Sequence, residues 1–144
     1  MASTKPRDLR EHTFLFARDI VAFCMAMSRT AGAQRQIAGQ LLRAGTSVGA
    51  NAEEAKASFG RRDFAYRNAV VLREARESKF WLRLIRACGL ADPNAVEPLL
   101  AEANELVGIY TATVRTAKEP APQGPPSGEQ KRNRATGSSD PDGK

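Results

Sequence analysis

Hydrophobic residues recur at intervals of three and four positions through most of residues 8–118, and no stretch alternates strictly between apolar and polar side chains. The first spacing is typical of one face of an α-helix, whereas strict alternation would indicate a β-strand. It predicts four helices, over residues 8–28, 34–57, 61–88 and from 92–94 onward. Gly89 suits the left-handed position that follows a helix end, and Asp92 followed by Pro93 is a typical helix start.

Each predicted helix has one apolar stripe that can be buried against its neighbours. The stripes consist of Leu9, Phe16, Ile20, Phe23, Cys24 and Met27 in the first helix, Ile37, Leu41, Ala44, Val48 and Ala55 in the second, Val70, Trp81, Leu84 and Ile85 in the third, and Leu99, Ala103, Leu106, Tyr110 and Val114 in the fourth. Short connections make consecutive helices neighbours in space. The predicted fold is therefore all-α, an antiparallel up-down four-helix bundle over residues 1–118.

Residues 119–144 differ in composition from the rest of the chain. They contain five of the eight prolines, four of the eleven glycines and, proline aside, no apolar side chain larger than alanine. Such a segment cannot bury a core, so we predict a disordered tail. Its charges cancel, and the formal net charge of +6 therefore belongs to residues 1–118.

No apolar stretch approaches the roughly 20 residues that a membrane-spanning helix needs. The N-terminal residues also lack the hydrophobic segment of a secretory signal. We therefore expect a cytoplasmic protein with no membrane partner. Cys24 and Cys88 lack a CxxC spacing and lie in apolar helical stretches, which predicts two buried free thiols rather than a disulfide.

The third predicted helix is strongly basic, with nine lysines or arginines and three acidic residues between positions 56 and 86. Seven of the basic residues fall within an arc of about 140° on a helical projection. They are Arg61, Arg62, Arg73, Arg76, Lys79, Arg83 and Arg86. Such a stripe suits contacts with the phosphates of a nucleic acid. A solvated face, or ion pairs with an acidic neighbour or subunit, would explain the same pattern.

Polar residues also lie along the apolar stripes of the second and third helices. They are Arg43, Asn51, Glu54, Glu74 and Glu77. Isolated polar groups are costly to bury, so we expect a buried network that fixes helix register, in which Asn51 bonds Arg43 and Glu74 or Glu77. Replacing Asn51 by Leu would then cost about 1 to 3 kcal/mol.

A metal site is the alternative interpretation of the carboxylates Glu54, Glu74 and Glu77. Metal sites in helical bundles combine glutamates with histidine in an ExxH motif, whereas this segment has ExxE and no histidine. We therefore predict no metal and no cofactor.

The first predicted helix has a second apolar flank, formed by Phe14, Val21 and Met25. Leu42 and Leu72 likewise lie outside their stripes. Together they predict a surface for self-association, because a monomer would leave them in water. A few exposed apolar residues are also normal in any monomer.

The chain has few residues of the kinds that catalysis needs. His12 is the only histidine, and the motifs HExxH, GxGxxG, GxSxG and the Walker loop are absent. The sequence therefore favours a protein without enzymatic activity over a bundle enzyme.

Three segments together carry a family resemblance: QLLRAGTSVGANAEEAKAS (residues 40–58), Asp63-Phe64, and LREARESKFWLRLI (residues 72–85). The chain resembles the four-helix-bundle proteins encoded in 23S rRNA intervening sequences, over residues 9–117. The resemblance implies a bacterial cytosolic bundle that assembles into a homopentameric ring. It extends to the accessory variability proteins of retroelements, in which a basic surface of the ring binds RNA and a reverse transcriptase.

The residues and the resemblance together predict a homo-oligomeric protein that binds structured RNA through its phosphate backbone. Phe80 is the one aromatic residue, among these basic side chains, that is placed to contact a base. The alternative is a ring-forming scaffold that binds a protein partner through the same face. A reverse transcriptase is a further partner that the resemblance implies.

Overall fold

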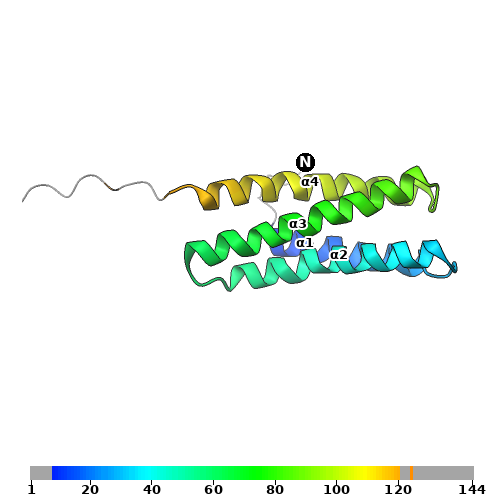
Figure 1. Ribbon diagram of the computed structural model, residues 1–144, viewed down its shortest axis with the longest axis horizontal. Coiled ribbons are helices and arrows are strands. Elements are labelled where there is room, and N and C mark those ends of the chain that lie inside the picture. The colour runs from blue at the N-terminus through cyan, green and yellow to red at the C-terminus, as the bar shows by residue number, and fades with distance from the viewer. Residues whose placement is uncertain (1–7, 121–123, 125–144) are drawn as a thin grey trace, which may run out of the picture.

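The computed structural model describes residues 8–120 and residue 124, and consists of four helices in which each runs opposite to the one before it (Figure 1). They are α1 (Leu9–Met27), α2 (Ala33–Lys56), α3 (Gly60–Ala87) and α4 (Pro93–Lys118). Each helix packs along the next, and α4 also contacts α1. The predicted antiparallel four-helix bundle is confirmed, and no strand occurs within the described residues.

The helices begin and end close to the predicted positions. Asp92 caps α4 by accepting a hydrogen bond from the backbone N–H of Asn94, at 2.9 Å, and Pro93 occupies the first turn. Gly89, after the end of α3, has a φ of 63°, which side chains with a Cβ rarely adopt. The other two connections also have a glycine with positive φ, Gly32 and Gly60. These glycines allow the chain to reverse within a few residues.

The core contains residues from all four helices. The stripes predicted for α1, α2 and α4 are buried, except that Leu9 and Ile37 are only partly covered. At Gly45, α1 and α2 come so close that a Cβ would lie 2.7 Å from Cγ2 of the buried Ile20. At Gly49, a Cβ would lie 3.2 Å from the Cβ of Ala17. The contact between α1 and α2 therefore depends on the absence of side chains at two positions.

The stripe predicted for α3 is wrong in part. Ile85 is buried as expected, but Val70, Trp81 and Leu84 are only partly covered. The buried face of α3 consists of Asn68, Val71, Leu72, Glu74, Ala75, Ser78, Leu82 and Ile85. Because this face includes polar side chains, its apolar periodicity is interrupted. Leu72 is buried rather than outside the stripe, so it cannot belong to a self-association surface.

The two cysteines have different environments. Cys24 is buried as predicted, and burial raises the pKa of its thiol to about 11. Cys88 is exposed, because it follows the last residue of α3 and lies at the turn into α4. The prediction of two buried thiols is therefore wrong for Cys88.

Among the residues that the structure describes, none of the helices is both long enough and apolar enough to cross a membrane. The tail predicted over residues 119–144 lies outside the described residues, apart from Glu119, Pro120 and Gly124.

Candidate nucleic-acid interface

Four of the seven predicted basic residues are exposed on α3 and form no ion pair within the described residues. Within residues 8–120, Arg62, Arg73, Arg76 and Arg83 form no side-chain hydrogen bond or ion pair. Lys79 is partly buried. The four arginines are therefore the cations of α3 that an external anion can reach most directly.

Arg61 and Arg86 instead connect α3 to α4. The guanidinium group of Arg61 donates to the backbone carbonyls of Thr116 and Ala117, both at 3.4 Å, and to that of Glu119. These carbonyls lie at the C-terminal end of α4, where acceptors lack helical partners and the helix dipole is negative. Arg86 pairs with Glu97 at 3.2 Å. Both side chains are thus engaged within the bundle.

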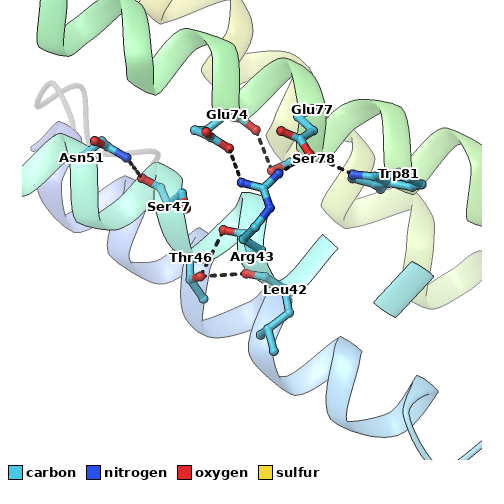
Figure 2. Close-up of polar contacts among 9 residues, drawn as sticks. All are labelled: Leu42, Arg43, Thr46, Ser47, Asn51, Glu74, Glu77, Ser78 and Trp81. Carbon is cyan, nitrogen blue, oxygen red and sulfur yellow. Dashed lines mark hydrogen bonds and ion pairs between the residues drawn. The ribbon is translucent and has the colours of Figure 1, made fainter. Parts of the chain in front are cut away.

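Arg43 of α2 lies between two carboxylates of α3 (Figure 2). Its Nη1 is 3.4 Å from Oε2 of Glu74, and its Nη2 bonds Glu77. The hydrogen bond from Arg43 lowers the pKa of Glu77, which also accepts a bond from the Trp81 indole at 3.3 Å. Glu74 is buried, whereas half of the Arg43 side chain is exposed. The structure therefore joins Arg43 to Glu74 and Glu77 at a half-exposed edge of the bundle, rather than within the buried network that was expected.

Asn51 does not join this group. Its Nδ2 donates to the carbonyl of Ser47, one turn earlier on α2, at 2.8 Å (Figure 2). The prediction that Asn51 bonds Arg43 and Glu74 or Glu77 is wrong, because its amide finds an acceptor on its own helix.

Glu54 belongs to a second ion pair, with Arg67 at 3.3 Å. Arg67 also bonds Asp63, one turn before it on α3, at 3.0 Å. The carboxylate of Asp63 accepts a bond from the backbone N–H of Phe59 at the start of α3, and this bond lowers its pKa. The three glutamates of the alternative metal site are therefore divided between two groups.

His12 lies beside acidic residues of α4, a contact that the sequence analysis did not predict. The imidazole is 2% exposed, and its Nε2 bonds Oε1 of Glu102. Glu105, one turn further along α4, completes a group whose possible ligand atoms lie within 4.8 Å of one another. The group has one nitrogen donor and an exposed glutamate, and a hydrogen bond between α1 and α4 accounts for it. We assign no metal to it.

The side chains predicted to mediate self-association are exposed. Phe14 and Met25 have about two thirds of their surface in solvent, at 60% and 66%, and Val21 is exposed to 36%. Val21, Met25 and Leu42 line a hollow between α1 and α2, together with the buried Cys24 and Ala38.

Exposed aromatic residues lie at the start of α3 and along it; the sequence analysis named Phe80 but missed Phe59 and Tyr66. Phe59 is 89% exposed, Tyr66 69% and Phe80 54%. They belong to a row in which residues follow each other at alternating steps of three and four, here named the outer row of α3. It comprises Phe59, Arg62, Tyr66, Ala69, Arg73, Arg76, Phe80 and Arg83. This spacing can be seen in the sequence, but only the basic residues and Phe80 were recognised there.

Comparison with known proteins gives a matching family and similar solved structures. The model of the family "23S rRNA-intervening sequence protein" matches residues 8–112. The chain is similar in fold to the crystal structure of a protein of unknown function from the S23 ribosomal protein family of Bacteroides thetaiotaomicron. The two chains share 24% sequence identity, the match covers 75% of this chain and 99% of the other, and the TM-score is 0.69. No curated protein matches the chain.

Proposed function

The chain belongs to the 23S rRNA-intervening sequence protein family, as its motifs predict, and we propose that it is a non-enzymatic protein that binds RNA through α3. The observation that carries the proposal is the exposure of four arginines on α3 that form no ion pair or side-chain hydrogen bond within the described residues: Arg62, Arg73, Arg76 and Arg83. Guanidinium groups that make no internal hydrogen bond are well suited to bind phosphate oxygens.

The arrangement of these arginines favours contact with the RNA backbone. They span 22 residues of one helix, which corresponds to about 30 Å. A stripe of this length can follow several successive phosphates, and phosphate contacts carry no sequence information. We therefore expect binding that depends strongly on salt and weakly on sequence.

The experiment is filter binding to a structured RNA over a series of salt concentrations. Arg73→Glu combined with Arg76→Glu should weaken binding to all sequences alike and flatten the salt dependence by about two phosphate contacts. The matched control is Arg18→Glu with Arg29→Glu, which changes the net charge equally on exposed residues outside α3.

Two results would contradict the proposal. An equal loss of binding in both double variants would assign the effect to total charge rather than to α3. A wild-type protein that binds no RNA at low salt would favour the alternative, a scaffold whose ring binds a protein partner. A reverse transcriptase is the partner to test first by co-purification in that case, because the retroelement accessory proteins resemble this chain.

We further propose that the protein assembles through Phe14, Val21 and Met25 into the homopentameric ring that the family resemblance implies. Exposed apolar side chains beside a hollow between α1 and α2 support this proposal. Met25→Glu should reduce the molar mass measured by light scattering after gel filtration. Ala101→Glu, at an exposed position of α4, is the control and should leave it unchanged.

A further inference from the structure

The outer row of α3 combines aromatic rings with arginines, and we propose that it binds single-stranded segments of RNA, with bases stacked on Tyr66 and Phe80. This inference rests on the proposed RNA binding and adds the form of RNA that is bound. The arginines would bind the phosphates of the RNA, and the aromatic rings would stack on its bases.

The spacing of the row places its members along one line of the helix surface. Positions seven residues apart on an α-helix differ by only about 20° around the axis. Tyr66, Arg73 and Phe80 follow each other at this interval, whereas Phe59 has extended backbone and precedes the first residue of α3. A strand that lies along α3 can therefore meet these three side chains on the same side.

The two rings of α3 are exposed to an unusual degree for large aromatic side chains. Tyr66 is 69% and Phe80 is 54% exposed, although burial of an aromatic ring contributes strongly to stability. Phe80 is also held in position, because its ring meets that of Trp81 edge to face, with centroids 4.9 Å apart and planes at 72°. More than half of the Phe80 side chain remains open to a ligand.

Arginines adjoin both rings at helical spacing. Arg62 precedes Tyr66 by one turn, while Arg76 and Arg83 lie one turn before and one turn after Phe80. No acidic residue belongs to the row. An alternation of cations and aromatic rings is the usual means of binding single strands, in which each phosphate is followed by a base with a free face.

Two other occupants fit the row less well. Duplex RNA offers phosphates but keeps its bases stacked on each other, so it leaves the rings without a partner. A second copy that presented the same row would place arginines opposite arginines, which disfavours association. Single-stranded RNA satisfies both kinds of side chain.

The test compares three labelled ligands of about 12 nucleotides: an unstructured RNA, the same strand in a duplex, and a strand of equal length without bases. Wild-type protein should bind the unstructured RNA about tenfold more tightly than the strand without bases. Tyr66→Leu combined with Phe80→Leu should abolish this difference and leave the affinity for the baseless strand unchanged. Phe64→Leu is the control, since Phe64 is an exposed phenylalanine of α3 that lies outside the row, and it should change neither affinity.

Trp81 provides a second measurement, because it is the only tryptophan of the chain and touches Phe80. Unstructured RNA should change the fluorescence of Trp81, and Phe80→Leu should remove that change.

Equal affinity of the wild type for strands with and without bases would overturn the proposal. So would a change of oligomer size in the Tyr66→Leu, Phe80→Leu variant with unchanged RNA affinity, which would identify the row as a contact between copies. Neither result bears on phosphate binding by the arginines. That binding would be contradicted if the Arg73→Glu, Arg76→Glu variant bound RNA as tightly as the wild type.

Discussion

Helix α2 contacts its two neighbours by different means. Toward α1 it presents Gly45 and Gly49, and the two backbones come close together. Toward α3 it presents Arg43, which binds Glu74 and Glu77 at a half-exposed edge. A close-packed contact is sensitive to each added methyl group, whereas water and salt weaken an exposed ion pair. The comparison indicates that packing on one side of α2 contributes more stability than charge on the other.

The largest effect should come from filling the close contact with α1. Gly45→Ala would place a Cβ 2.7 Å from Cγ2 of Ile20, and we expect it to lower the free energy of unfolding by about 2 kcal/mol. Gly39→Ala is the matched control on the same helix, because nothing lies within 4 Å of its Cβ position. It should stabilise the protein by about 0.5 to 1 kcal/mol through helix propensity. Urea denaturation measures both, and equal effects would contradict the comparison.

The contact between α1 and α4 is buried and polar at once, and it provides an intermediate case. His12→Leu removes the bond to Glu102 and fills the same buried position with an apolar side chain of similar size. We expect a loss of about 1 kcal/mol, the usual net value of a hydrogen bond inside a protein. Thermal unfolding followed by circular dichroism measures it. If His12→Leu lowered the free energy of unfolding as much as Gly45→Ala, this contact would contribute as much stability as the close packing of α1 on α2.

The ion pairs between α2 and α3 should matter less. Arg43→Met should destabilise the bundle by less than Gly45→Ala, and added salt should weaken the wild type toward the variant. Because Arg43 lowers the pKa of Glu77 below its ordinary value of 4.5, this stabilisation is fully present above pH 4.5. It is lost as the pH falls through the lowered pKa of the folded protein. Urea midpoints of both proteins across this range should therefore converge at low pH, and a constant difference would contradict the assignment.

The smallest effect is expected for Asn51→Leu. A buried cross-helix network would have made this change costly, but the amide only donates to the carbonyl of Ser47 on the same helix. We expect the free energy of unfolding to change by less than about 0.5 kcal/mol, as for surface substitutions. A loss of 1 kcal/mol or more in urea denaturation would restore a structural role for Asn51, since about that much is typical of a lost buried hydrogen bond.

The fold was predictable because its signals are local. Apolar spacing, Gly89 and Asp92 locate the helices, and short connections determine their order. The inner face of α3 was not predictable from apolar spacing, because it includes Glu74 and Ser78. The Ser78 hydroxyl donates to the Glu74 carbonyl at 2.9 Å, so a polar side chain is satisfied within its own helix.

The candidate sites were predictable to different extents. Charged residues at compatible positions indicated that Arg43, Glu74 and Glu77 would lie close together, but not that they would pair at a half-exposed edge without Asn51. The contact of His12 with Glu102 joins residues 90 positions apart, and no local pattern relates them. Exposure of Tyr66 depends on which side of α3 faces the core, which the sequence analysis placed incorrectly. The alternating spacing of the outer row was nevertheless present in the sequence.

The short connections between the helices also bear on how the chain folds. Most contacts join segments that are adjacent along the chain, and proteins with such local contacts fold rapidly. The contact of α1 with α4 is the exception, because it requires closure of the longest loop. We therefore expect the hairpins to form first and the contact of α1 with α4 to close last. During synthesis, α1, α2 and α3 can then assemble before α4 leaves the ribosome.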